Sequence, residues 1–273
     1  MFHSIGDKSP NWNGWKLVLP AVSIGNVGQL AMDLVITTLS MKKVGYLHHE
    51  SLQALCGNDA LNSNSGITEG NLTIGTEVFE QADKRLVCVQ QRVLFVKGKQ
   101  AAFRRDLLEW IKTCGFTSVT VLTSSASHER IDCQLTGNPF RYLTTPSFDK
   151  LLGDSFEKTF DWTRLERRKD NWSGNHGNQS DITDEASGVF IPGGGLAAKL
   201  FRECCERDVA LAVLLVFCSE GDNIPDALNL VQYLNQWLKL AEENSAGNAK
   251  GGPWKYPASW SLLFGREVDP TLY

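Results

Sequence analysis

The chain has 273 residues and a mass of 30.3 kDa, and 42% of its residues are hydrophobic, 21% charged and 10% aromatic. This composition excludes a disordered, collagen-like or coiled-coil chain, and the length suits one large α/β domain or two smaller domains. With 27 basic and 31 acidic residues the formal net charge is −4, so no overall positive field attracts nucleic acid or an anionic membrane surface.

Strands and helices are predicted to alternate along the chain. Apolar runs predict strands at residues 17–23, 86–96, 118–124, 188–191 and 209–218. Helical patterns lie at residues 28–41, 101–114, 196–206 and 225–241. Several of the strand runs are nearly continuous in Val, Leu and Ile, which is typical of strands that are buried on both faces. We therefore predict a single α/β domain with a largely parallel sheet flanked by helices.

Three polar segments interrupt this alternation. Residues 57–71, 166–187 and 242–253 are rich in Asn, Ser, Gly and charge, and are predicted to be surface loops or disordered. Their positions leave an α/β domain over residues 1–265, followed by a C-terminal tail at residues 266–273.

The cysteines and the N-terminus indicate an intracellular protein. The seven cysteines form an odd number without a C-x-x-C motif, and most lie in apolar runs, so we interpret them as reduced thiols. Residues 1–10 lack the apolar segment of a signal peptide, and no run reaches the roughly 18 apolar residues of a membrane span.

Two predicted helices are more apolar than a helix with one buried face requires. Residues 30–41 leave only a narrow polar sector, and in residues 225–241 two adjacent apolar stripes span an arc of roughly 240°. Two explanations are open: other parts of this chain cover the additional apolar surface of these helices, or a partner protein covers it. On the second interpretation, Leu34 and Trp237 are candidate partner-binding residues.

Two glycine-rich turns each precede a predicted helix. Residues 23–28 contain one half of a G-x-G-x-x-G dinucleotide fingerprint, but Ser23 occupies the position of the first glycine. The turn Gly193-Gly194-Gly195 could present N–H groups to an anion, yet it lacks the Lys-Ser/Thr of a P-loop. Close passage of the chain past a neighbouring backbone explains both turns, and we favour that structural interpretation.

An acidic loop follows the most apolar strand, where open α/β sheets place their ligands. Glu220, Asp222 and Asp226 are candidates for an acid, a base or metal ligands, but no His or Cys accompanies them at ligand spacing. Asp222 or Asn223, just before Ile224-Pro225, equally predicts a helix cap, and we favour the cap.

Two further groups of residues have the types but not the pattern of a catalytic or metal site. Residues 124–132 hold the types of a hydrolytic triad, namely Ser124, Ser125, His128 and Asp132. The serines are not in a G-x-S-x-G motif. The adjacent His48 and His49 would point to opposite faces of a strand, which disfavours a shared metal. We therefore predict no catalytic residues, no metal site and no cofactor.

The C-terminal region combines an aromatic cluster with a short tail. The cluster in residues 254–264 is expected to fold back on the domain, whereas Gly265 and Pro270 let the last residues project. An apolar terminus ending in Leu272 and Tyr273 resembles a peptide ligand whose carboxylate is paired in a pocket. A frayed terminus is the alternative.

Five blocks of sequence resemble the proteasome assembly chaperone 2 family. They are LPAVSIGNVGQLAMDL (residues 19–34), NPFRYL (138–143), IPGGG (191–195), SEGDNIPDA (219–227) and SWSLLFG (259–265). The blocks occur in order between residues 17 and 265, and each is compositionally unusual. The polar segments and the last eight residues contribute little to the resemblance.

The resemblance implies a nucleoside phosphorylase-like α/β fold that is used without known catalysis. It also implies an obligate heterodimer with proteasome assembly chaperone 1, located in the cytoplasm and nucleus. The heterodimer would bind α-type subunits of the proteasome core particle, promote closure of the α-ring and prevent rings from pairing wrongly. In this family a C-terminal hydrophobic-Tyr-any residue ending docks between α-type subunits. This chain departs from that pattern, because Tyr273 is last rather than penultimate.

The alternative function is an enzyme of the phosphorylase or hydrolase type. The turn from Gly193 to Gly195 would cradle an anion of the substrate, and Glu220 or Asp222 would act as the base. The anion site brings no Arg or Lys clamp and no His base, which disfavours this hypothesis.

Overall fold

The structure is a computed structural model that describes residues 1–6, 9–61, 72–152, 155–167, 189–242 and 252–262. Within these residues an eight-stranded sheet has the order β1-β3-β6-β7-β2-β8-β10-β9. The strands are β1 (Phe2–Ser4), β2 (Lys16–Pro20), β3 (Lys42–Leu47), β6 (Thr76–Gln81), β7 (Leu86–Gln91), β8 (Ser118–Ala126), β9 (Phe140–Thr144) and β10 (Leu211–Cys218). A separate pair joins β4 (Cys56–Asn58) to β5 (Leu72–Ile74).

The parallel part of the sheet is its centre. Strands β7, β2, β8 and β10 run parallel to one another, whereas the pairings β1–β3, β3–β6, β6–β7 and β10–β9 are antiparallel. The predicted single α/β domain with a helix-flanked sheet is confirmed; the sheet is mixed, with a parallel centre and antiparallel strands at both edges.

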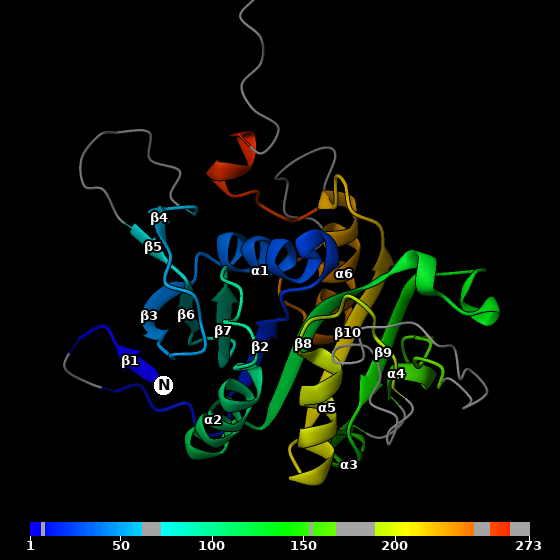
Figure 1. The fold of residues 1–273 in the computed structure, drawn as a ribbon, viewed down its shortest axis with the longest axis horizontal. Helices are drawn as coiled ribbons and strands as arrows, with labels where there is room; N and C mark the ends of the chain where they lie inside the picture. The colour runs from blue at the N-terminus through cyan, green and yellow to red at the C-terminus, as the bar shows by residue number, and fades with distance from the viewer. Residues whose placement is uncertain (7–8, 62–71, 153–154, 168–188, 243–251, 263–273) are drawn as a thin grey trace, which may run out of the picture.

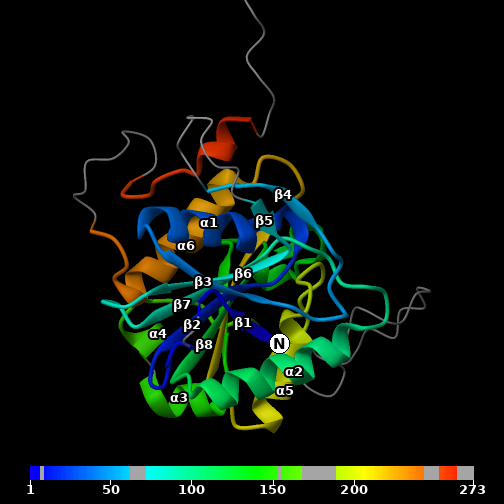
Figure 2. The ribbon, with the colours of Figure 1, turned by 90° about the vertical axis from the view of Figure 1, so that its left-hand side faces the viewer.

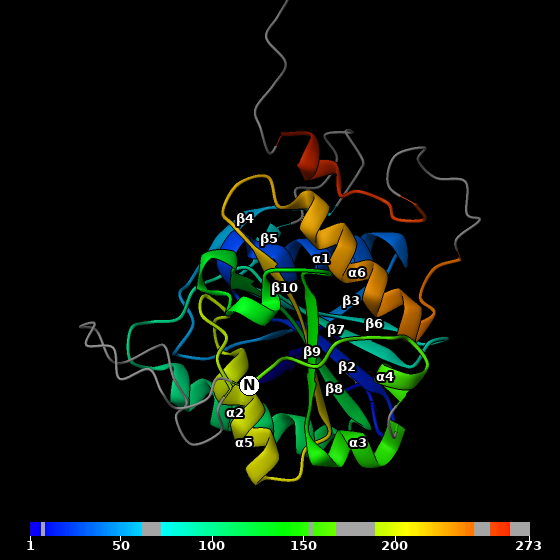
Figure 3. The same cartoon turned by 90° about the vertical axis from the view of Figure 1, so that its right-hand side faces the viewer.

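Helices cover both faces of the sheet. They are α1 (Val27–Thr38), α2 (Gln100–Cys114), α3 (Pro146–Leu152), α4 (Ser155–Lys158), α5 (Ala197–Glu206) and α6 (Ile224–Leu238). Figure 1 shows α1 and α6 above the sheet and α2 and α5 below it, and Figures 2 and 3 show the same layers from the two sides. All four long helices were predicted from the sequence.

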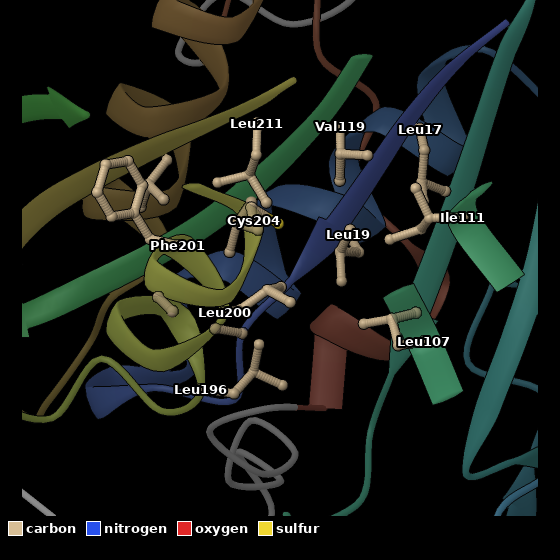
Figure 4. Packing of buried hydrophobic residues seen from close by; sticks show 14 of the residues in the cluster. Leu17, Leu19, Leu107, Ile111, Val119, Leu196, Leu200, Phe201, Cys204 and Leu211 are labelled. Carbon is tan, nitrogen blue, oxygen red and sulfur yellow. The ribbon is translucent and has the colours of Figure 1, made fainter. Parts of the chain in front are cut away.

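Each central strand supplies two hydrophobic cores, because alternate side chains point to opposite faces. In β10, Leu211 and Val213 belong to the core beneath α2 and α5, and Ala212 and Leu214 belong to the core beneath α1 and α6. Figure 4 shows the first core, in which leucines of α2 and α5 converge on Leu17, Leu19 and Val119 of the strands. Burial on both faces explains why β10 contains no Ser, Thr or charged residue.

Two of the predicted strands differ from the structure. The strand predicted over residues 86–96 ends at Gln91 in the main sheet. Beyond it, the Arg92 N–H donates to the Gly75 carbonyl next to β6, and Phe95 forms an isolated bridge with Leu52. The strand predicted at residues 188–191 is wrong for 189–191, which enter no strand of the main sheet. The chain turns there, and the Gly194 N–H donates to the Ile191 carbonyl.

Parts of the predicted polar segments can be compared with the structure. Residues 62–71, 168–187 and 243–251, and the tail at 266–273, lie outside the described residues. Gly57 and Asn58 belong to β4, and Glu166 forms an ion pair with the buried Arg141 at 3.0 Å. The first residues of these two segments are therefore more ordered by contacts than predicted. In the described part of the chain no helix is long and apolar enough to cross a membrane.

Candidate functional site

The carboxyl ends of β2, β8 and β10 meet at one edge of the sheet, which is the usual ligand site of open α/β folds. Here Ser23, after β2, and Ser124, in β8, bond to each other. Their hydroxyl oxygens are 2.8 Å apart, and the Ser124 N–H donates to Ser23 Oγ at 3.1 Å. Ser124 Oγ also lies 2.5 Å from the carbonyl oxygen of Ile24. Hydrogen bonds within the chain therefore join the end of β2 to β8 at this edge of the sheet.

The glycines of the two candidate ligand-binding turns, residues 23–28 and 193–195, pack closely against neighbouring backbone. A Cβ on Gly28 would lie 2.3 Å from a backbone oxygen of β8, and a Cβ on Gly195 would lie 2.3 Å from the Val22 carbonyl oxygen. Gly193 has a φ of 73°, in the left-handed region, and its carbonyl accepts the Ile24 N–H at 2.8 Å. The structural interpretation of both turns is confirmed.

The acidic loop after β10 organises the start of α6. Asp222 Oδ1 accepts the N–H of Ile224, the first residue of α6, at 3.1 Å, whereas Asn223, which occupies the N-cap position, makes no side-chain cap hydrogen bond. Asp226 Oδ2 accepts Asn223 Nδ2 at 2.8 Å. Glu220 is exposed. In the alternative enzyme site, the turn from Gly193 to Gly195 and the carboxylate of Asp222 are thus engaged in local structure, whereas Glu220 extends into solvent.

The hydrolytic triad considered from the sequence is not assembled either. Ser124 and Ser125 are buried and bond to Ser23 and to the Pro192 carbonyl, respectively, instead of an imidazole. His128 is exposed, and its Nε2 lies 3.9 Å from a carboxylate oxygen of the adjacent Glu129. Asp132 is exposed as well.

A thiol at the same edge is unsuited to nucleophilic chemistry. Burial raises the pKa of Cys218, the last residue of β10, to about 11. The thiol is therefore protonated at neutral pH, whereas the thiolate is the reactive form.

His49 has a structural role that uses both of its ring nitrogens. Its Nδ1 accepts the Ser51 N–H at 3.0 Å, so Nε2 carries the proton that Asp106 Oδ2 accepts at 3.0 Å. His48 is exposed and does not share these partners. Throughout the described ranges, no cluster of three or more His, Cys, Asp or Glu side chains is suited to hold a metal ion.

The two unusually apolar helices pack on each other and on further segments of this chain. Trp254 and Trp260, beyond α6, are buried in the same core as α1 and α6, and the Lys255 N–H donates to Thr38 Oγ1 at the end of α1 at 2.9 Å. Phe148 of α3 and Phe156 of α4 pack against the outer part of α6. The structure therefore shows the first of the two explanations, burial within the chain.

The four residues predicted to bind a partner have different positions. Leu34 is 0% exposed, so its expected contact with a partner is corrected: its side chain packs wholly inside this chain. Trp237 is half-buried, with its ring 5.5 Å from Phe148. Leu272 and Tyr273 lie outside the described residues.

The sequence reasoning missed four exposed apolar side chains on the segments that follow β3 and β7 and on β5: Leu55, Leu72, Leu94 and Val96. Leu94 and Val96 were expected to be part of a buried strand, and the short strands β4 and β5 were not predicted. The sequence carries no signal for this exposure, because Val93, Leu94, Phe95 and Val96 are all apolar and form a run typical of a buried strand.

The sequence matches a known family over most of its length. The model of the PAC2 family matches residues 17–245. Proteasome assembly chaperone 2 of Homo sapiens is 42% identical, and the match covers 100% of both chains. Proteasome assembly chaperone 2 of Nematostella vectensis is 44% identical over 87% of this chain and 94% of its own length.

A solved structure shares the fold at low sequence identity. Pyrococcus furiosus PbaA, described as an archaeal homolog of proteasome-assembly chaperone, has a TM-score of 0.58 and 16% identity, and the match covers 89% of this chain and 88% of that chain. The molecule is thus an α/β protein whose usual ligand edge is closed at its serines and glycines. The chain belongs to the PAC2 family, and the family resemblance noted in its sequence blocks is confirmed.

Proposed function

We propose that this chain is a non-catalytic chaperone that acts as a heterodimer with proteasome assembly chaperone 1. The heterodimer binds α-type subunits of the proteasome core particle, promotes α-ring assembly and prevents off-pathway dimerisation of rings. The observation that carries this proposal is the end-to-end similarity to proteins named proteasome assembly chaperone 2. The complex is expected in the cytoplasm and nucleus.

The closed edge of the sheet supports binding rather than catalysis. The loops that hold the ligand in many α/β enzymes are joined here by the Ser23–Ser124 hydrogen bond and by glycine packing. Such a domain works through its outer surface. A chaperone of this kind masks the apolar patches and strand edges of an assembly intermediate until the next subunit replaces it.

The C-terminal tail is a proposed second contact. Leu272 and Tyr273 would insert between α-type subunits, with the terminal carboxylate paired to a cation or to backbone N–H groups. Deletion of these two residues is expected to weaken ring binding and to leave the heterodimer intact. Unchanged ring affinity of the deletion variant would exclude this role of the tail.

The proposed function is tested by affinity purification from cell extract, with the tag at the N-terminus so that Tyr273 stays free. Mass spectrometry of the retained proteins should show proteasome assembly chaperone 1 in about equal amount. It should also show α-type subunits with few mature β-type subunits. A chain that is recovered alone would contradict the proposal, and ligands for the region around Gly193 and Asp222 would then be screened.

A further inference from the structure

The last described segment of the chain crosses the outer side of α1. We call residues 252–262 the belt, and its end is a short 3-10 helix, η4 (Ala258–Leu262). Figures 1, 2 and 3 show η4, the red helix, on the side of α1 that faces away from the sheet. The belt thus adds a further layer to the α1 side of the domain.

Two tryptophans of the belt are buried in the core. Trp254 is 2% and Trp260 is 8% exposed, and both belong to the core that α1 and α6 form with the sheet. Trp254 Nε1 also donates to Gln232 Oε1 of α6 at 3.4 Å. Tyr256 lies between the two tryptophans in the sequence and is 39% exposed. Because large aromatic side chains bury the most apolar surface, the two tryptophans oppose detachment of the belt.

Hydrogen bonds tie the belt to two elements that are distant in the sequence. The Lys255 N–H donates to Thr38 Oγ1 at the end of α1 at 2.9 Å. Ser259 Oγ donates to the Ala60 carbonyl at 2.7 Å, and the Ala60 N–H donates to Thr73 Oγ1 of β5 at 3.3 Å. The belt therefore cannot shift along α1 without breaking its contacts with both α1 and the segment beside the β4–β5 pair.

The belt sets the length of chain between the body of the domain and the proposed docking residues. Leu272 lies ten positions after Leu262, so an extended chain spans at most about 35 Å between them. Without the belt the tether would start at residue 242 and would be 30 residues long. The effective concentration at the end of a flexible tether falls with roughly the −3/2 power of its length, so a threefold longer tether lowers it about fivefold.

We propose that the belt is a positioning segment for the C-terminal tail. It fixes the start of the tail on the outer side of α1 and keeps the tether to Leu272 and Tyr273 short. This inference rests on the proposed function, in which those two residues contact α-type subunits. Trp254 and Trp260 act through the tail, because a short tether raises the effective concentration of the docking residues once other surfaces of the heterodimer have bound.

Hydrogen exchange followed by mass spectrometry measures whether the belt is anchored. The sample is the full-length chain in its heterodimer, free and bound to α-type subunits. The Lys255 N–H donates to Thr38 Oγ1, and the Trp260 N–H donates to the Pro257 carbonyl at 3.1 Å. Peptides that contain these amides are expected to exchange at least about tenfold more slowly than in the unfolded chain. Exchange at the unfolded rate would overturn the inference.

Ring binding of a variant with a released belt tests the positioning role. Trp254→Ala combined with Trp260→Ala removes both buried rings, and Tyr256→Ala is the matched control, because it removes an exposed ring from the same segment. Surface plasmon resonance measures the affinity of each heterodimer for α-type subunits, and thermal unfolding and light scattering show that it is folded and paired. The release variant is expected to bind about fivefold more weakly, and the control to bind like the wild type.

A milder variant covers the case in which the release variant does not fold. Thr38→Val combined with Ser259→Ala removes the two hydrogen bonds that reach α1 and the Ala60 carbonyl. Faster exchange of the belt peptides in this variant should be accompanied by weaker ring binding. Faster exchange with unchanged ring affinity, in either folded variant, would overturn the inference.

Deletion of Leu272 and Tyr273 separates positioning from direct contact. In a chain that lacks these two residues, release of the belt is expected to cause no further loss of ring affinity. An equal loss with and without the two residues would overturn the inference, because the belt would then contact α-type subunits itself. Unchanged affinity after the deletion alone would instead refute the proposed tail contact, and the positioning role with it.

Discussion

Replacing Leu34 distinguishes a core residue from a partner-binding residue. Leu34 lies in α1 with 0% of its surface exposed, in the core that also contains Leu230 and Leu234 of α6 and Trp254. Leu34→Ala removes three buried carbon atoms and leaves a cavity, so the free energy of unfolding should fall by about 3 kcal/mol, within the range of about 2–5 kcal/mol for buried leucines. Leu34→Arg would also bury an unpaired charge, and we expect that variant to unfold.

The measurement is equilibrium unfolding in urea, followed by circular dichroism and tryptophan fluorescence. With a slope of about 3 kcal/mol per M, the midpoint should decrease by about 1 M. Leu135→Ala is the matched control, because the same side chain is exposed there, and its unfolding should change by less than about 0.5 kcal/mol. If Leu34→Ala unfolds like this control while losing a partner, the assignment of Leu34 to the core is refuted.

Three further predictions concern backbone packing, pH and thiols. Gly28→Ala should destabilise the fold by about 1–3 kcal/mol in thermal unfolding, because the added Cβ meets a backbone oxygen at 2.3 Å; an unchanged melting temperature would contradict this. Hydrogen bonds from Arg105 and then from a histidine lower the pKa of Asp106. Its contribution to stability is therefore present above the unfolded pKa of about 3.9 and lost as pH falls through the folded pKa. Wild type and Asp106→Asn should differ in stability at pH 7 and converge near the acid limit, whereas a constant difference would exclude this linkage. Thiol labelling of the native chain should modify the exposed Cys56 before Cys88, whose pKa is raised by burial, and equal rates would show that the core opens readily.

The sequence by itself determined the central layers of the domain. Apolar runs identified β2 and β10, a run of Val and Leu among Thr and Ser identified β8, and helical spacing identified α1, α2, α5 and α6. These signals are local, because a strand buried on both faces must be apolar at nearly every position. The sequence blocks also identified the family, and the absence of a complete catalytic motif favoured a binding protein.

The antiparallel edges depended on tertiary structure. Strand β6 carries Glu77, which is buried but paired with Lys43 at 3.0 Å, so its sequence lacks the apolar pattern of a buried strand. Strand β3 contains an irregularity at Gly45, where a Cβ would meet Phe2 and His3. The partners that make these sequences acceptable as strands lie far away along the chain.

Tertiary structure also decided which apolar surfaces are covered. The sequence shows that α1 and α6 are apolar around most of their circumference, but only the fold shows that they cover each other and that Trp254 and Trp260 complete their burial. Conversely, Leu94 lies in an apolar run that resembles a core strand, yet it is exposed, and the strand of the main sheet that contains the start of this run ends at Gln91. Composition sets how much apolar surface a chain has, and long-range packing decides which part of it remains free to bind a partner.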